Sequence, residues 1–156
     1  MKKKMLIIAI IIIIILIMVI GFMIYKDYTQ DYNQDNQIIL NSVNFTMPAG
    51  FYEGTPNAAG DMNITNGTAT IFIAKYGGTN ITKYIKEYVN ATKKSNQHVS
   101  INNFTLNNTV VYKSINNDTP AKHYWFIKDN KVYSIYIWQE FNNSDSIICD
   151  MIKSMG

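Results

Sequence analysis

Three lysines at the N-terminus are followed by an almost unbroken apolar run over residues 5–24, in which isoleucine predominates. A helix of about 20 residues, at about 1.5 Å rise per residue, matches the roughly 30 Å hydrocarbon core of a bilayer. The run holds no charged residue, so no buried charge opposes its insertion. We therefore expect residues 5–24 to form a transmembrane helix.

A cleaved secretory signal peptide is the alternative interpretation of this segment. The apolar core of a signal peptide spans about 7–15 residues and ends at the small residues of a cleavage site. Here the run is longer, and the bulky residues Phe22, Met23 and Tyr25 stand where small residues would be needed. The sequence therefore favours an uncleaved signal-anchor.

The charge distribution predicts the orientation of the chain. Lys2, Lys3 and Lys4 should remain in the cytoplasm, as the positive-inside rule requires. They account for the whole formal charge of +3, because removing these 3 from the 14 lysines leaves 11, which balance the 11 acidic residues. An exported part without net charge or arginine offers little to a phosphate backbone, so we expect no nucleic-acid partner.

These features divide the chain into four segments. We expect a cytoplasmic tail over residues 1–4, the anchor over 5–24, a polar juxtamembrane stalk over 25–37 and an exported globular domain over 38–156. The last segment is long enough to bury a core of its own. The expected location is the cell membrane, with a single pass and the C-terminal domain outside the cytoplasm.

Asparagine-x-serine/threonine sequons are unusually frequent in the exported part. About three are expected by chance from the serine and threonine content, and nine are present, eight of them with threonine. They suggest passage through an N-glycosylation machinery, although turns, caps and an AT-rich coding bias would also enrich asparagine. The candidate acceptors are Asn44, Asn63, Asn66, Asn80, Asn90, Asn103, Asn107, Asn117 and Asn142.

Alternating segments separated by turn residues predict about six or seven strands. Residues 44–48 form the first, and Asn66-Gly67 lies between segments 61–65 and 68–76 as a hairpin signal. Three more strands follow over residues 99–106, 109–115 and 121–128. A two-residue turn at Asp129-Asn130 would then pair residues whose numbers sum to 259, which places His123 opposite Tyr136. Both faces of this last hairpin are mainly apolar, so we expect both to be covered at least in part.

Two amphipathic helices complete the predicted fold. The first runs to about Lys94 from a cap at Thr79 or Asn80, with Ile81, Ile85 and their helical neighbours on one face. The second covers about residues 143–155. The fold class is therefore α+β, with an antiparallel sheet packed against two helices.

Two local patterns resemble the PsbP-like domain class, named for an extrinsic subunit of photosystem II. Its members tend to open with Phe-x-x-Pro-x-Gly-Phe/Trp, matched here by Phe45, Pro48, Gly50 and Phe51. They tend to end with an aromatic hairpin and a terminal helix, matched by residues 133–138 and 147–155. The resemblance implies a PsbP-like sandwich and extracytoplasmic relatives that bind partner proteins, and it transfers no functional residue.

The best candidate ligand surface is formed by His123, Tyr136 and Trp138, which the predicted register places on one face of the last hairpin. Aromatic rings with polar tips suit ligand contact, and they equally suit an ordinary core. Cys149 is the single cysteine, so no intrachain disulfide can form. No catalytic motif or metal-ligand spacing occurs, so we assign no catalytic, cofactor or metal residue.

The sequence leaves three functions open. The favoured one is a membrane-tethered binding or accessory domain that docks another envelope protein or a ligand. The second is an extracytoplasmic enzyme of hydrolase type, whose site would be assembled from scattered residues. The third is an abundant glycosylated surface component, which depends on the sequons.

Overall fold

The computed structural model describes residues 37–40 and 43–155, which contain nine strands and two helices. The predicted transmembrane helix and almost all of the stalk lie outside these residues and stay predictions. The helices are α2 (Ile81–Lys94) and α3 (Ser144–Lys153). The strands are β1 (Gln37–Leu40), β2 (Val43–Thr46), β3 (Tyr52–Glu53), β4 (Met62–Thr65), β5 (Thr70–Tyr76), β6 (Val99–Leu106), β7 (Thr109–Asn116), β8 (Lys122–Lys128) and β9 (Lys131–Ile137).

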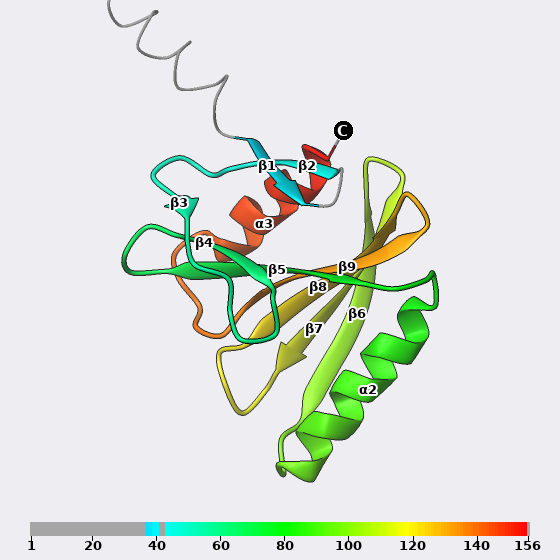
Figure 1. The fold of residues 1–156 in the computed structure, drawn as a ribbon. Helices are drawn as coiled ribbons and strands as arrows, with labels where there is room; N and C mark the ends of the chain where they lie inside the picture. Colours follow the sequence, from blue (N-terminus) through cyan, green and yellow to red (C-terminus); the bar gives the residue numbers. More distant parts are fainter. Residues whose placement is uncertain (1–36, 41–42, 156) are drawn as a thin grey trace, which may run out of the picture. The chain divides into compact units, whose positions relative to one another are not determined.

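Seven strands form one antiparallel sheet in the order β3-β4-β5-β9-β8-β7-β6 (Figure 1). The expected α+β class and an antiparallel sheet of about six or seven strands with two helices are confirmed, but β1 and β3 were not expected. The strand expected over residues 44–48 differs, because β2 pairs with β1 in a separate two-stranded sheet. Ile38, Val43 and Phe45 are almost fully buried there, so the small sheet packs against the core and does not extend the large one.

The turn residues explain the local pairing. Asp129 and Asn130 have φ values of 48° and 57°, as a two-residue type I′ turn requires, and the predicted pair His123↔Tyr136 is present. Asn107 and Asn108, with φ values of 43° and 65°, connect β6 to β7 in the same way. At Asn66 the predicted hairpin forms with a longer turn, because Thr65 pairs with Thr70. The Asn66 Oδ1 atom accepts from the Thr68 and Ala69 N–H groups and holds that turn.

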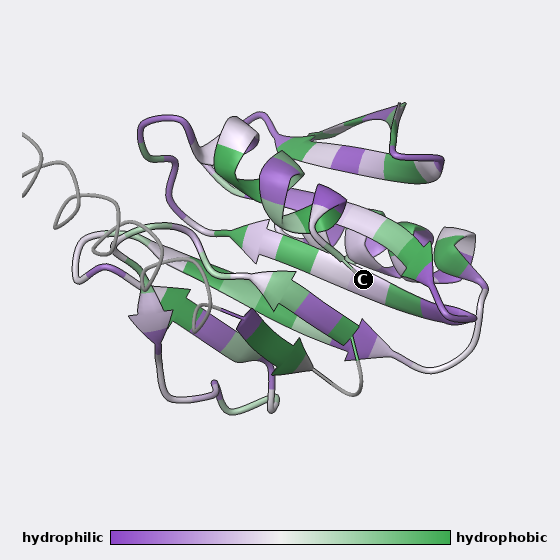
Figure 2. Cartoon of the chain, turned by 90° about the horizontal axis from the view of Figure 1, so that it is seen from above, coloured by the Kyte–Doolittle hydropathy of each residue, from purple (hydrophilic) through white to green (hydrophobic). Residues whose placement is uncertain are grey.

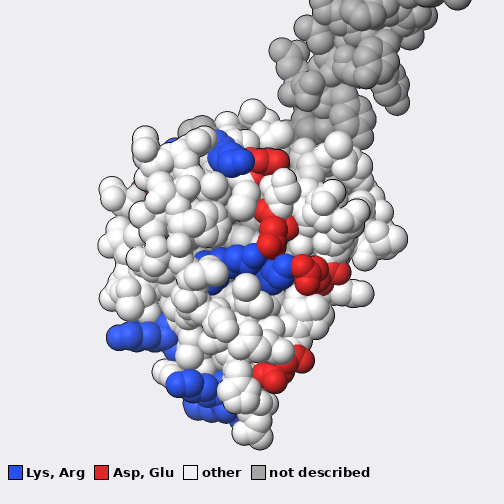
Figure 3. Space-filling view, turned by 180° about the vertical axis from the view of Figure 1, so that it is seen from behind, with Lys and Arg blue, Asp and Glu red and all other residues white. Residues whose placement is uncertain are grey.

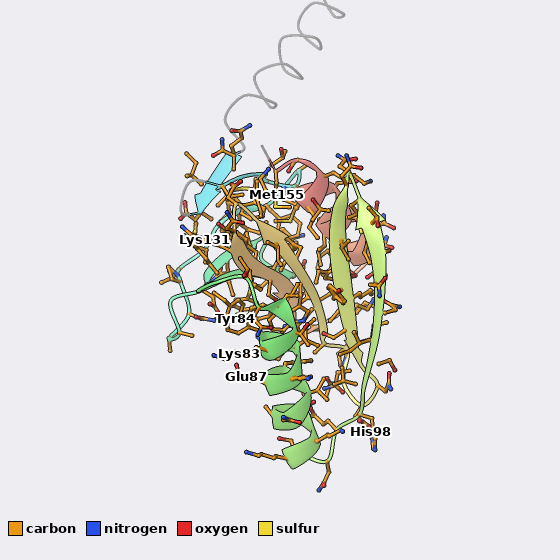
Figure 4. The ribbon with its side chains drawn as sticks, turned by 90° about the vertical axis from the view of Figure 1, so that its right-hand side faces the viewer. Lys83, Tyr84, Glu87, His98, Lys131 and Met155 are labelled. Atoms are coloured by element: carbon orange, nitrogen blue, oxygen red, sulfur yellow. The ribbon has the colours of Figure 1, made fainter. Side chains whose placement is uncertain are left out.

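Helix α2 begins at the predicted cap, where the Asn80 Oδ1 atom accepts a hydrogen bond from the Lys83 N–H. Ile81 and Ile85 are buried against Trp125 and Val132 of the sheet. Figure 4 shows Lys83, Tyr84 and Glu87 along this helix, and His98 beyond its C-terminal end. We call the sheet surface that α2 contacts the α2 face.

The opposite surface, the α3 face, carries the larger core. Tyr133, Ile135 and Ile137 of β9 are fully buried there, while the preceding Val132 faces α2. Ile148 and Met151 of α3 pack into the same cluster. The alternating hydropathy along the strands is visible in Figure 2. The last hairpin is therefore covered on both sides over most of its length, with Ile127 exposed, as its mainly apolar faces predicted.

Strand β6 is at one end of the sheet, and no other strand in the described residues pairs with its outer side. The Asn117 N–H donates to the His98 carbonyl. Because backbone hydrogen bonds alternate along an antiparallel pair, the N–H groups of Asn102 and Phe104 point toward β7. The N–H groups of Ile101 and Asn103 then point away from β7. They should exchange with solvent at least about tenfold faster than those of Asn102 and Phe104.

Amide hydrogen exchange followed by NMR would measure this difference, and the alternating residues of central strand β8 provide the control. In β8 both sets of amides have a neighbouring strand, so both should be protected. Equal protection along β6 would contradict the prediction and would mean that another chain covers this edge.

Candidate functional site

Four rings form a row across three strands of the α2 face. We call Phe72, Tyr136, His123 and Trp125 the aromatic row. Successive ring centroids are 5.0, 4.8 and 5.5 Å apart, and successive ring planes are within about 11° of parallel. The row forms because Phe72 and His123 both lie directly opposite Tyr136 in the sheet, where cross-strand side chains are in contact.

His123 is the buried polar member of the aromatic row. It is 5% exposed, and the centroid of its ring lies 4.3 Å from the ring centroid of Tyr88 in α2. Neither ring nitrogen has a hydrogen-bond partner in the described part of the chain. Burial lowers the pKa of His123 to about 3, because the imidazolium form would lose its hydration. The ring is therefore neutral at physiological pH.

Tyr136 is tied to the loop that precedes β4. Its hydroxyl donates to the Asp61 Oδ2 atom at 2.7 Å and accepts from the Asn57 Nδ2 atom at 3.1 Å. Burial raises the pKa of Tyr136, and the hydrogen bond to Asp61 raises it further. This phenol is therefore a fixed hydrogen-bonding group and not a proton-transfer group near neutral pH.

Trp138 has a different environment. Its side chain is 56% exposed just after the end of β9, and its ring meets His123 and Tyr136 edge-on at 5.7 and 5.3 Å. The structure thus brings all three candidate residues together. Two of them are buried, as a core would require, and only Trp138 is presented to solvent.

A cavity lies on each side of Trp138. One, of about 360 Å³, is lined by Thr68, Thr70, Phe72 and Gln139, among others. The other, of about 460 Å³, lies beside the C-terminal half of α2 and is lined by residues that include Gln97, Asn116 and Thr119. We call Trp138 together with both cavities the Trp138 groove.

Sequence reasoning missed the side walls of this groove. The pairing of β5 with β9 places Phe72 opposite Tyr136 and brings Thr70 beside Trp138. Tyr88 reaches the groove from α2. Periodicity identified the strand and the helix that carry these residues, but no local signal indicates which strands become neighbours across about 60 residues of chain.

The largest charged cluster lies on the α3 face. The Asp145 carboxylate, in the first turn of α3, accepts from Lys113, Lys122 and the Tyr124 hydroxyl, and Lys122 also pairs with Glu140. Figure 3 shows basic and acidic side chains meeting at the centre of an otherwise mostly uncharged surface. Partial burial acts to raise the pKa of Asp145, but these hydrogen bonds outweigh it and lower the pKa to about 2.

Each charged group of this cluster has an opposite charge, so the arrangement attaches α3 to the sheet and leaves no free acid or base. Among the described residues, no group of three or more His, Cys, Asp and Glu side chains could hold a metal ion. In the same part of the chain, neither helix is long and apolar enough to cross a bilayer.

The nine sequon asparagines all lie in the described domain. Asn44 is partly buried, and Asn63 is 9% exposed with its Nδ2 atom donating to the Thr55 carbonyl. Attachment of a glycan to Asn63 would require this local structure to open, because Nδ2 is the atom that carries the sugar. The other seven are exposed: Asn66, Asn80, Asn90, Asn103, Asn107, Asn117 and Asn142.

Comparison with known proteins supports the fold assignment alone. No protein-family model matches the chain, and no curated protein matches it. Among solved structures, the domain is similar to cyanobacterial PsbP (CyanoP) from Synechocystis sp. PCC 6803. The TM-score is 0.52 and the sequence identity 9%, over 77% of this chain and 90% of that one. The chain therefore has a PsbP-like fold.

Proposed function

We propose that the chain is a membrane-tethered extracytoplasmic binding domain whose ligand surface is the Trp138 groove. The main support for the proposal is Trp138. Its large ring is 56% exposed between two cavities and contacts the buried rings of His123 and Tyr136. Exposed aromatic side chains on a rigid base lose little conformational entropy on binding, which is why they dominate many recognition surfaces.

The surroundings of the groove favour binding over catalysis. His123 is neutral and shielded from solvent, and the Tyr136 phenol is held by Asp61. Glu140, the charged residue that lines the first cavity, is paired with Lys122. A hydrolytic site needs a nucleophile or base that can reach a substrate. His123 is shielded from solvent, and Tyr136 and Glu140 are held by other residues.

Tethering to the membrane follows from the predicted anchor at residues 5–24, and the PsbP-like fold agrees with an accessory role only by analogy. In this proposal the anchor holds the domain at the outer surface of the membrane, where the groove meets its ligand. The tether raises the local concentration of the domain at that surface.

Site-specific photocrosslinking in the full chain tests both parts of the proposal. A benzophenone side chain replaces either Ala91, an exposed residue of α2 that lines the second cavity, or Tyr52, which is 56% exposed but lies on β3, outside the groove. Membranes are washed at alkaline pH before irradiation, so that only integral proteins remain. We expect the chain to stay with the membranes and to form an adduct from position 91 and not from position 52.

Loss of the chain in the alkaline wash would contradict the tether. Equal labelling from both positions, or none from position 91, would contradict the assignment of the groove as the binding surface.

A further inference from the structure

We propose that the Trp138 groove binds a neutral carbohydrate chain laid across the strands, with one sugar on the indole ring and further sugars in the two flanking cavities. This inference rests on the proposed function and adds the chemical class of the ligand. It follows from the direction of the groove, the chemistry of its walls and the position of the exposed ring.

The direction of the groove argues against a peptide. Its lining comes from β5 and β7, from α2, and from residues beside the ends of β8 and β9. Strands β5 and β7 each have a neighbouring strand on both sides, so an extended peptide finds no free strand edge there. A ligand in this position must be recognised by side chains.

The groove walls supply neutral donors and acceptors. Thr68, Thr70 and Gln139 line one cavity, and the two threonine hydroxyls, which donate to Asn66 and Thr65, can still accept hydrogen bonds. On the other side, the hydroxyl of Thr119 lies near the amides of Gln97 and Asn116, which bond to each other at 2.8 Å. The carboxylate of Glu140 already pairs with Lys122. These walls suit a ligand rich in hydroxyl groups and without charge, since a charged one would lack a counter-ion.

The exposed ring provides the remaining element of sugar recognition. One side of a pyranose presents C–H groups, which pack on an aromatic face, while its equatorial hydroxyl groups point sideways to polar walls. Trp138 offers such a face with hydroxyl and amide groups on both sides. Because cavities of about 360 and 460 Å³ flank a single ring, the groove accommodates a chain of about three units better than one monosaccharide.

Analysis of the photocrosslinked adduct identifies the ligand class. The benzophenone probe at position 91 of the full chain is irradiated in its native membranes, and the adduct is then treated with periodate or with protease. We expect periodate, which cleaves vicinal diols of sugars, to collapse the added mass. The intact adducts should form a ladder spaced by monosaccharide units.

Two matched variants test whether the ligand spans the groove. Thr70→Val and Thr119→Val each remove one hydroxyl with little change in shape, on opposite sides of Trp138. Adduct yield is compared with the same probe at Ala91, which leaves Trp138 and the polar walls of the groove intact. We expect each variant to reduce the yield severalfold while the far-UV circular dichroism is unchanged.

The possible failures are distinguishable. A protein or lipid adduct at position 91 would overturn the carbohydrate assignment and leave the proposed binding function in place. An adduct insensitive to Thr70→Val or to Thr119→Val would overturn the spanning arrangement. Absence of an adduct at position 91 would overturn both this inference and the proposed function.

Discussion

Replacing His123 with phenylalanine should make the domain Ile38–Gly156 much less sensitive to acid between pH 6.5 and pH 3. In the folded chain, burial lowers the pKa of His123 to about 3, whereas in the unfolded chain the imidazole titrates near its ordinary value of 6.5. Between these values the unfolded state binds a proton that the folded state does not. Stability is therefore lost as the pH falls, by about 1.4 kcal/mol per pH unit.

Phenylalanine retains the stacking position between Tyr136 and Trp125 and cannot be protonated. The measurement is urea unfolding at a series of pH values from 8 to 4, with the free energy of unfolding plotted against pH. Below pH 6.5, the free energy of unfolding of His123→Phe should change less steeply with pH than that of the natural chain, by about 1.4 kcal/mol per pH unit. At pH 8 the variant should be at least as stable as the natural chain, because two buried nitrogens without partners are removed.

Ser134→Ala is the matched control for this prediction. Ser134 is fully buried, and its hydroxyl likewise has no hydrogen-bond partner in the described residues, but it does not titrate in this range. Its removal should leave the slope unchanged. If His123→Phe also leaves the slope unchanged, the imidazole is not held neutral in the folded domain.

Asp145→Asn should destabilise the domain by about 1–2 kcal/mol at pH 7. The Asp145 carboxylate accepts hydrogen bonds from Lys113, Lys122 and Tyr124, and hydrogen bonds to a charged group contribute about 1.5–3 kcal/mol. The expected loss is smaller than for a fully buried pair, since the Asp145 side chain is 49% exposed and partly screened by solvent. Equilibrium unfolding in urea measures it.

The pH dependence of this effect has a definite sign. The folded pKa of Asp145, about 2, is below its ordinary value of 3.8, so the carboxylate stabilises the fold above pH 3.8 and loses this effect as the pH falls toward 2. The difference in unfolding free energy between Asp145→Asn and the natural chain should shrink over that interval.

Asp150→Asn is the control. It breaks an exposed pair with Lys153 on the same helix and should change the free energy of unfolding by less than about 0.5 kcal/mol. Equal effects of the two variants would contradict the structural role of the Asp145 cluster.

Features determined by neighbouring residues could be predicted from the sequence. Asp129 and Asn130 tolerate positive φ, so they specify a two-residue turn, and the turn determines the pair His123↔Tyr136. Asn80 followed by the apolar stripe of Ile81 and Ile85 specifies where α2 begins and which side is buried. The local chemistry alone decides these features.

Features that depend on distant parts of the chain could not be predicted in the same way. Nothing in the alternation of β5 indicates that Phe72 will lie opposite Tyr136, or that the two threonines of the groove will flank Trp138. His123 is buried and Trp138 is exposed, and this difference in exposure depends on how far α2 extends over the sheet. The Asp145 cluster likewise joins residues from two strands and a helix.

The use of asparagine as a turn and cap residue affects how glycosylation can be mapped by mutation. Asn107 adopts positive φ in the β6–β7 turn, Asn66 holds the β4–β5 turn and Asn80 caps α2. Changing these residues to glutamine would remove a sequon and a backbone support together, so a loss of expression could be mistaken for the loss of a glycan. Replacing the threonine two positions later abolishes each acceptor site and keeps the asparagine in place. The substitutions for these three sites are Thr109→Ala, Thr68→Ala and Thr82→Ala.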